Sequence, residues 1–256
     1  MRIDQCFSAF GHFGPQLREK YQLNPYRIKD EPSLFYGIYG SQVNKVLAHK
    51  SIAVLLWSGS DCADFANHPD RISALKAKAN VYHIAKSKFI FNTLASIGIE
   101  SHHIPITTNT NDDLKPEPLG DAVYLYKGHS EQYGRSYNEA VMDAYPDLEY
   151  IQTDLHSYNR EELIEVYKKC FIGLRCIAHD GLSHTVIEMG LLGRPVIWNG
   201  GTPNALHYDT VEGVVAKFGM ILAMKDKIDT ESIADSMVRY LDIGTDWLDT
   251  DYYLKS

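Results

Sequence analysis

The stretch that decides the fold is Asp180-Gly181-Leu182-Ser183-His184-Thr185-Val186-Ile187-Glu188-Met189-Gly190-Leu191-Leu192-Gly193-Arg194-Pro195-Val196-Ile197. It follows a strand-length apolar run at 172–177, crosses a short polar loop, continues with helical spacing over 185–192 and returns to a strand through Gly-Arg-Pro. In such a unit the helix begins at the carboxyl edge of a parallel sheet. The backbone amides at its start, over 183–186, therefore predict an anion site, and phosphate is the expected anion.

Glu188 lies one turn inside this predicted helix, four residues after His184, so that the two side chains can share a face. A carboxylate placed there can accept hydrogen bonds from two vicinal hydroxyls, such as those of a ribose. The alternative is an exposed helix acid, but the apolar neighbours over 186–189 favour the site. Two further alternatives stay open. Asp180 either contacts a sugar or caps the following turn, and His184 either donates to a ligand or only occupies the first helical turn.

Strands and helices are expected to alternate along the chain. Short apolar runs predict strands at 52–57, 122–126, 172–177 and 195–198. Amphipathic spacing predicts helices at 87–94 with Ile97, 137–144, 160–169, 185–192 and 230–241, several of them opened by Ser, Asn, Asp or Thr caps. This alternation indicates an α/β protein with parallel, doubly wound sheets.

One polar segment, 107–120, contains two prolines and has no hydrophobic period. We interpret it as a linker between domains or a surface loop. It divides the chain into a first lobe, 1–108, and a second lobe, 119–256, each near the lower size limit of an α/β domain. The expected architecture is therefore two small Rossmann-like lobes that face a cleft.

These residues resemble the GT-B glycosyltransferases of the family 4 kind, retaining enzymes that use nucleotide sugars. That family typically carries Glu, seven residues and a second Glu, followed by Ala-Met-Ala-x-Gly-x-Pro-Val-Ile. Here Asp180, seven residues and Glu188 precede Met189 and the ending Gly193-Arg194-Pro195-Val196-Ile197. The resemblance implies that Glu188 binds the nucleotide ribose, that the amides of 183–186 bind the diphosphate, and that Asp180 and Gly181, with Leu182 beside them, bind the transferred sugar. Asp in place of the first Glu has a shorter reach and leaves the identity of the sugar open.

Three weaker matches accompany that motif. The strand at 54–57 leads into Gly59-Ser60-Asp61, and the segment 81–106 is similar to the helix-Leu-Gly-Ile-Pro segment that precedes the family's interlobe linker. The run Tyr124-Leu125-Tyr126-Lys127-Gly128, followed by Tyr133-Gly134-Arg135, stands where the family opens its second lobe. By resemblance, Lys127, Gly128 and Arg135 contact the diphosphate. Order and spacing agree over roughly 50–200, which a single motif does not achieve.

The first 50 residues fit the family less well. Residues 1–7 predict a first strand and 8–14 its glycine loop, but few strands can precede Gly59, so the N-terminal, acceptor-side lobe is expected to be reduced. Within that loop, His12 is either a polar group on the acceptor side or a structural residue. Asp61 either orients the acceptor or closes its own turn by an Asx hydrogen bond, and we favour the turn.

Composition limits the classes of function. The 33 acidic and 25 basic residues give a net charge of -8, which disfavours nucleic-acid binding unless a local basic groove exists. Four cysteines without C-x-x-C spacing are expected to be buried and reduced. No apolar stretch approaches 18 residues and no leader is evident, so we expect a cytoplasmic protein without a membrane span. The eleven histidines form no ligand set, and Asp249-Thr250-Asp251 only mimics a metal motif, so no metal site is expected.

The resulting hypothesis is a metal-independent glycosyltransferase with retention of configuration. Its nucleotide diphosphate donor, for which a UDP-sugar is expected, serves as co-substrate, and no cofactor is needed. The acceptor stays open among a saccharide, a lipid-linked glycan, a protein and a modified DNA base. The alternative is a non-catalytic subunit that binds a nucleotide sugar. The terminal helix at 230–241 and the aromatic residues after it either cross back onto the first lobe or form a plain end or a homodimer contact.

Overall fold

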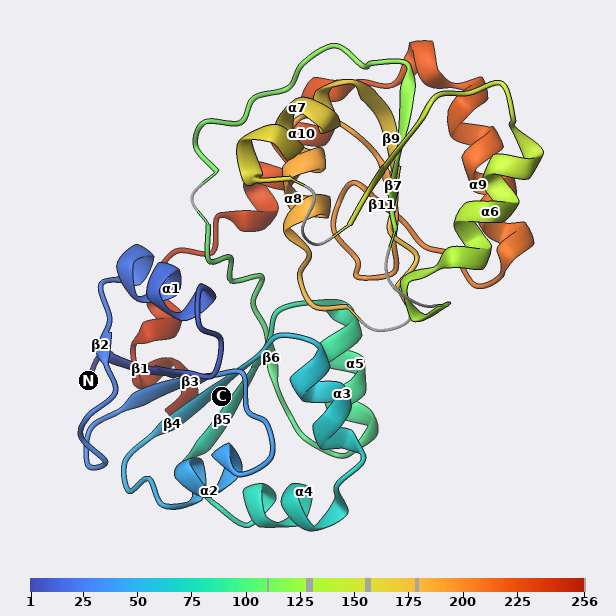
Figure 1. The fold of residues 1–256 in the computed structure, drawn as a ribbon. Coiled ribbons are helices and arrows are strands. Elements are labelled where there is room, and N and C mark those ends of the chain that lie inside the picture. The colour runs from blue at the N-terminus through green and yellow to red at the C-terminus, as the bar shows by residue number, and fades with distance from the viewer. Residues whose placement is uncertain (110, 128–130, 155–157, 178–179, 256) are drawn as a thin grey trace. The chain divides into compact units, whose positions relative to one another are not determined.

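The computed structural model describes residues 1–109, 111–127, 131–154, 158–177 and 180–255. Contacts divide the chain into two compact units, shown in Figure 1. Unit 1 comprises Met1–Thr110, Asp180–Leu182 and Asp242–Ser256, and unit 2 comprises Asn111–His179 and Ser183–Leu241. The expected lobes, 1–108 and 119–256, placed the segment 180–182 in the second lobe and left open whether the tail crosses back onto the first, whereas the contacts assign both to unit 1.

Unit 1 is built on a six-stranded parallel sheet of order β2-β1-β3-β4-β5-β6. Its strands are β1 (Gln5–Ser8), β2 (Asn24–Pro25), β3 (Ser33–Tyr36), β4 (Ala53–Trp57), β5 (Val81–Ala85) and β6 (His102–His103). Its helices are α1 (Phe13–Tyr21), α2 (Gln42–Leu47), α3 (Ser60–Ala66), α4 (Pro69–Lys76), α5 (Lys88–Ser96) and α11 (Asp251–Leu254), with the 3-10 turn η3 (Asp246–Leu248). The apolar run predicted at 52–57 is the buried strand β4, as expected for a strand covered on both faces.

Two hydrophobic clusters cover the two faces of this sheet. Val54 and Leu56 of β4 belong to the cluster that contains residues of α1, and Leu55 and Trp57 belong to the cluster with α2 to α5. This division follows from the period of two along a strand. The tail joins the first cluster through Trp247, Leu248 and Tyr253. Backbone hydrogen bonds tie the tail to the first residues, from the Ile3 amide to the Leu248 carbonyl at 2.7 Å and from the Thr250 amide to the Met1 carbonyl at 2.7 Å.

Unit 2 is built on a five-stranded parallel sheet of order β11-β10-β9-β7-β8. Its strands are β7 (Ala122–Tyr126), β8 (Tyr150–Thr153), β9 (Cys170–Leu174), β10 (Val196–Ile197) and β11 (Ala205–Leu206). Its helices are α6 (Arg135–Ala144), α7 (Arg160–Lys168), α8 (His184–Leu191), α9 (Val211–Ala223) and α10 (Thr230–Leu241), with the 3-10 turns η1 (Glu131–Tyr133) and η2 (Lys225–Lys227). In Figure 1, α7, α8 and α10 lie on one side of this sheet and α6 and α9 on the other.

The predicted elements of unit 2 are present with small shifts. β7 and α10 have the predicted bounds, and α8 begins one residue before the predicted helix. The strand predicted at 172–177 is β9, which starts and ends earlier, because its pairing with β10 ends at Leu174. The Ile177 amide then donates to the Arg175 carbonyl at 3.0 Å, and the chain leaves the sheet.

Arg194 holds the end of the polar segment 107–120 onto unit 2. Its side chain is fully buried, and it donates to the Glu117 carbonyl at 3.0 Å, the Pro118 carbonyl at 2.7 Å and the Lys168 carbonyl at 3.1 Å. These carbonyls compensate a charge that would otherwise be costly to bury. The Arg of the Gly-Arg-Pro ending therefore has a structural function.

All four cysteines are free and buried. In the described part of the chain, no helix is both long and apolar enough to span a membrane.

Candidate active site

The predicted basic residues of the donor site follow β7. Because the strands of unit 2 are parallel, the ends of β7 and β9 lie at one edge of the sheet. Lys127 directly follows β7 and is exposed, with its amide donating to the Thr153 carbonyl at 2.7 Å. Arg135 is exposed and is the first residue of α6, the next helix. Gly128 lies outside the described residues. The roles of Lys127 and Arg135 stay predictions, although both residues follow the carboxyl end of β7.

Arg175 is a cation at the same edge that the sequence interpretation missed. It directly follows β9, and its guanidinium carbon lies 4.6 Å from the centre of the Tyr126 ring. A planar guanidinium stacks well on an aromatic face. In the sequence, Arg175 is a single charged residue near the end of an apolar run, and we included it in the predicted strand at 172–177.

The first turn of α8 is held in place by tyrosines of neighbouring elements. Ser183 occupies the N-cap position with extended backbone, and its side chain forms no cap hydrogen bond. The hydroxyl of Tyr167 in α7 donates to Thr185 Oγ1 at 3.1 Å, and its ring meets the Tyr124 ring of β7 edge-on at 5.0 Å. His184 and Thr185 are half-buried, whereas Val186 is fully buried. The helix start expected to bind an anion is thus fixed by packing.

Glu188 is buried, with 3% of its surface exposed, so the alternative of an exposed helix acid is wrong. Its Oε1 accepts a hydrogen bond from Arg160 Nε at 2.9 Å. Burial raises the pKa of Glu188 to about 7, although the Arg160 charge and hydrogen bond lower it. This carboxyl group therefore titrates near neutral pH, as groups at functional sites often do. Its role as a ribose ligand stays a prediction.

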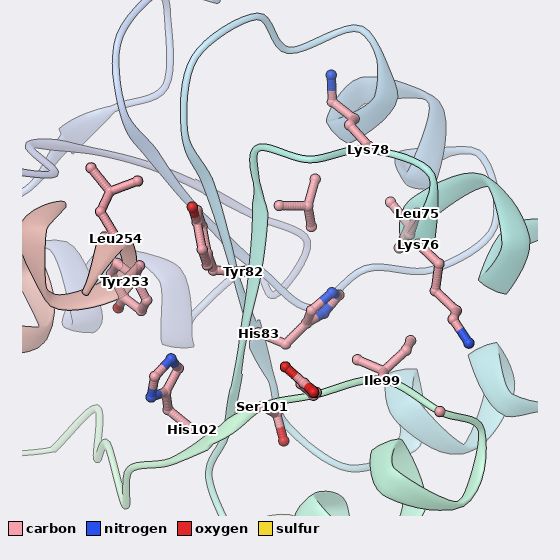
Figure 2. A pocket seen from close by; sticks show the side chains of 13 residues that line it. Leu75, Lys76, Lys78, Tyr82, His83, Ile99, Ser101, His102, Tyr253 and Leu254 are labelled. Carbon is pink, nitrogen blue, oxygen red and sulfur yellow. The ribbon is translucent and has the colours of Figure 1, made fainter. Parts of the chain in front are cut away.

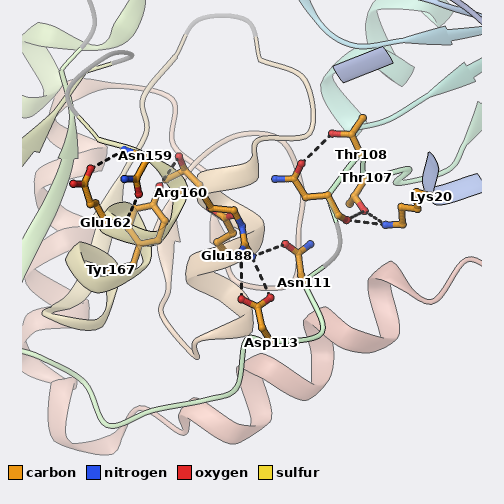
Figure 3. Close-up of polar contacts among 12 residues, drawn as sticks. Lys20, Thr107, Thr108, Asn111, Asp113, Asn159, Arg160, Glu162, Tyr167 and Glu188 are labelled. Atoms are coloured by element: carbon orange, nitrogen blue, oxygen red, sulfur yellow. Dashed lines mark hydrogen bonds and ion pairs between the residues drawn. The ribbon is translucent and has the colours of Figure 1, made fainter. Parts of the chain in front are cut away.

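Arg160 was not among the predicted site residues, and Figure 3 shows it between Glu188 and Asp113. It is the first residue of α7 because Asn159 caps that helix. Asn159 accepts from the Glu162 amide at 2.9 Å, and Glu162 accepts from the Asn159 amide at 2.8 Å, which completes a capping box. The Asn-x-x-Glu pattern predicts this helix start, but the sequence does not indicate which acids Arg160 contacts.

Asp61 closes a turn at the carboxyl edge of the unit 1 sheet. Its Oδ1 accepts from the amides of Ser58 at 3.0 Å, Gly59 at 2.9 Å and Cys62 at 2.9 Å. The residue is fully buried, and burial raises its pKa against the lowering effect of these bonds. Asp61 therefore closes its turn through the amides at 58, 59 and 62, and not through the Asx hydrogen bond to the amide two residues on that we favoured. A contact between Asp61 and the acceptor stays a prediction. We assign Asp61 to the shape of this loop.

Gly181 packs against the same turn, within unit 1. A Cβ atom on Gly181 would lie 1.8 Å from the Ser58 carbonyl oxygen, and one on Gly59 would lie 2.7 Å from the Gly181 amide nitrogen. Gly59 also has φ +132, which side chains disfavour. Both positions therefore require glycine for backbone packing. The neighbouring Asp180 is half-buried and Leu182 is buried, and their predicted sugar contacts stay predictions.

Lys86 is the third functional candidate that the sequence interpretation missed, after Arg175 and Arg160. It directly follows β5 and is 3% exposed, and its Nζ donates to the Tyr36 hydroxyl at 3.3 Å. Burial lowers the pKa of Lys86 to about 8. The charges of Asp61 and Asp180 raise it, and that of Lys20 lowers it further. A lysine after an apolar strand was the available signal, but its burial is not visible in the sequence.

His12 is exposed at the N-cap of α1, without a side-chain cap bond, and its ring lies 3.9 Å from the Phe13 ring. Its acceptor-side role stays a prediction. Among the described residues, no three His, Cys, Asp or Glu side chains are grouped as metal ligands. In the motif 249–251, Asp249 instead pairs with the N-terminal ammonium at 3.3 Å.

A cavity of about 540 Å³ lies at the amino end of β5 (Figure 2). Lys86 follows the other end of that strand. It exists because β6 pairs only from Ile84 onward, so the first residues of β5 lack a strand on that side. His83 lines the cavity, and its Nδ1 accepts from Trp57 Nε1 at 3.1 Å. Burial lowers the pKa of His83 to about 4, so the ring is neutral. This cavity is separate from the predicted site residues.

No protein-family model matches the sequence, and neither does any curated protein. Solved structures do match. TarM aligns with a TM-score of 0.57 at 8% identity, over 95% of this chain and 57% of TarM. Sucrose-phosphate synthase from Thermosynechococcus elongatus aligns with a TM-score of 0.60 at 12% identity, over 90% of this chain and 71% of the synthase. A glycosyltransferase from Rickettsia africae aligns with a TM-score of 0.51 at 10% identity, over 89% of this chain and 75% of that protein.

These matches and the two parallel sheets give the chain the GT-B fold of glycosyltransferases, which confirms the predicted fold class. A TarM variant from S. aureus was crystallised with UDP, and it aligns with a TM-score of 0.50 at 10% identity, over 90% of this chain and 59% of that one. The chain therefore spans less than two thirds of the length of TarM. At these identities the similarity shows the fold alone.

Proposed function

We propose that the protein is a glycosyltransferase that moves a sugar from a nucleotide diphosphate donor, with a UDP-sugar as the first choice. The observation that carries this proposal is the buried Glu188 carboxyl group one turn inside α8, where that helix starts at the carboxyl edge of the unit 2 sheet. A carboxylate there can accept from both hydroxyls of a ribose. The UDP bound to the TarM variant supports a nucleotide diphosphate as the ligand of this fold.

The diphosphate would bind at the start of α8. A helix N-terminus carries a partial positive charge and presents free amides to an anion. Lys127 and Arg175 follow the ends of β7 and β9 at the same sheet edge, and Arg135 starts the helix after β7. These three cations would neutralise the charge that develops on the leaving diphosphate, and each such contact is worth about 2 to 4 kcal/mol in comparable sites. We propose that they replace a metal ion in this role.

The transfer would retain configuration, as in the family that the motif resembles. The bond from the anomeric carbon to the diphosphate oxygen breaks, and a bond to the acceptor oxygen forms on the same face. The acceptor proton passes to the leaving diphosphate. In unit 1, Lys86 would donate a hydrogen bond to a substrate oxygen, since its buried ammonium has only the Tyr36 hydroxyl as a hydrogen-bond acceptor among the described residues.

Calorimetric and thermal titration with UDP and with uridine and guanosine diphosphate sugars tests the donor site. A ligand at 100 times its Kd stabilises the folded state by about 2.7 kcal/mol and raises the melting temperature. We expect this for the wild type and a roughly tenfold or greater loss of affinity in Glu188→Gln. The matched control is Glu161→Gln, an exposed acid in the first turn of α7, which should bind as the wild type does.

Slow hydrolysis of the sugar nucleotide that binds would then establish turnover. Binding without any hydrolysis or transfer would favour the non-catalytic subunit. If no nucleotide raises the melting temperature, the donor site itself is wrong.

A further inference from the structure

Arg160 connects the proposed ribose carboxylate to the segment that enters unit 2. Its Nε donates to Glu188 Oε1 at 2.9 Å, while Nη1 and Nη2 lie 3.2 and 3.3 Å from the two carboxylate oxygens of Asp113 (Figure 3). Nη2 also lies 3.5 Å from Asn111 Oδ1. One guanidinium group therefore contacts a buried acid of α8 and an exposed acid of the polar segment 107–120.

The geometry of these contacts is specific to arginine. A guanidinium group is a rigid planar fork, so one edge can bind a carboxylate with two parallel hydrogen bonds while Nε points elsewhere. Here the fork binds Asp113 and Nε binds Glu188. The capping box of Asn159 and Glu162 fixes the backbone of Arg160 at the start of α7. Arg160 therefore holds the Glu188 carboxyl group from a fixed backbone position, and its two bonds to Asp113 set the orientation of the guanidinium group.

The charges around Glu188 show why it needs this partner. The Arg160 charge and hydrogen bond lower the pKa of Glu188, whereas burial and the Asp113 charge raise it. The Glu188 charge in turn raises the pKa of Tyr167 in α7. Burial alone favours the protonated form, in which one oxygen carries a hydrogen and becomes a donor, so that the group no longer offers two equivalent acceptors to the ribose hydroxyls.

We propose that Arg160 is a positioning residue for the nucleotide, which orients the Glu188 carboxylate and favours its ionised form, with Asp113 as its anchor. This inference rests on the proposed function, since it assumes that Glu188 meets the ribose. It assigns a functional reason to the start of α7 and to the acid at 113.

The test compares Arg160→Met, Arg160→Lys and Asp113→Asn with the wild type. NMR titration of the Glu188 side chain in the ligand-free protein should show its pKa raised by about 1 or more in Arg160→Met. Calorimetry should show UDP binding roughly tenfold weaker at pH 7 and a pH midpoint of binding shifted upward. Arg160→Lys should recover part of the UDP affinity and part of the normal Glu188 pKa. Asp113→Asn should lose less UDP affinity than Arg160→Met.

Lys168→Met is the matched control. Lys168 lies on the same helix and pairs with Glu117 of the same segment at 3.1 Å, but it does not touch Glu188. It should leave UDP binding unchanged. The inference is overturned if Arg160→Met binds UDP as well as or better than the wild type, or if Lys168→Met weakens binding equally. Failure of the proposed function is distinct, because the wild type itself would then not bind UDP. An unchanged Glu188 pKa in ligand-free Arg160→Met would overturn the inference independently of any nucleotide.

Discussion

Lys86 is the residue whose chemistry depends most on its surroundings. Its ammonium group is buried at the end of β5 and donates to a tyrosine hydroxyl, and burial lowers its pKa from 10.5 to about 8. The unfolded chain therefore binds more protons than the folded one between pH 8 and pH 10.5. The resulting destabilisation is complete below pH 8 and disappears as the pH rises toward 10.5.

Replacing Lys86 by Met should remove this penalty and also reduce sugar transfer. We expect the variant to be more stable than the wild type at pH 7, by up to roughly 3 kcal/mol, with the difference shrinking toward pH 10. Urea unfolding at several pH values measures it, and a transfer or donor-hydrolysis assay measures the loss of activity. The control is Lys50→Met, because Lys50 is an exposed lysine of the same unit, and this variant should change neither the stability nor the activity. Loss of stability without loss of activity would make Lys86 structural.

At the scale of elements, two loops of unit 1 meet without side chains between them. The turn after β4, closed by Asp61, and the segment 180–182 approach so closely that glycine is required at 59 and 181. The glycine after Asp180 thus has a packing reason that is independent of any sugar. Its retention in the motif does not by itself show a sugar contact.

Gly181→Ala should therefore destabilise unit 1 or displace the turn. We expect a loss of about 1 to 3 kcal/mol, since the added carbon would overlap the Ser58 carbonyl oxygen. Chemical denaturation measures the loss. The control is Gly11→Ala, where nothing lies within 4 Å of the added carbon and the change should be small. Equal stability of the two variants would contradict the close approach.

At the scale of the whole molecule, the chain returns to unit 1 after α10. The tail, 242–256, supplies Trp247 and Tyr253 to a core cluster of unit 1, and its backbone bonds to the first residues of the chain. The predicted alternatives were a tail that crosses back and a plain end or dimer contact. In the structure the tail is part of the unit 1 core.

Trp247→Ala tests this assignment, because the indole is 1% exposed. Large-to-small changes of a buried tryptophan cost about 3 to 5 kcal/mol. We expect a loss of that size in equilibrium denaturation. Tyr252→Ala, in the same tail but 39% exposed, should lose much less. A tail that only touched the surface would make both variants similarly mild.

Much of the fold was predictable because its signals are local. Apolar periodicity and capping residues predict the bounds of β7 and α10 and place the start of α8 within one residue. They also predict the cap at Ser87, which accepts from the Ile90 amide. The candidate site was predictable in part, since the motif at 180–197 indicated Glu188 and the helix start. The turn around Asp61 was predicted, but not the amides that its carboxylate would bind.

The sequence by itself determined the alternation of strands and helices and the position of the acid in α8, because each depends on the spacing of nearby residues, and the motif's resemblance to a known family implied the GT-B class of fold. Only the tertiary structure decided that Arg160 meets Glu188 and Asp113, that Lys86 is buried, and that the tail packs in unit 1. The physical reason is that ion pairing, desolvation and burial depend on which segments pack together, and these partners lie 28 and 47 residues apart in the two ion pairs. Local patterns contain no record of such distant contacts.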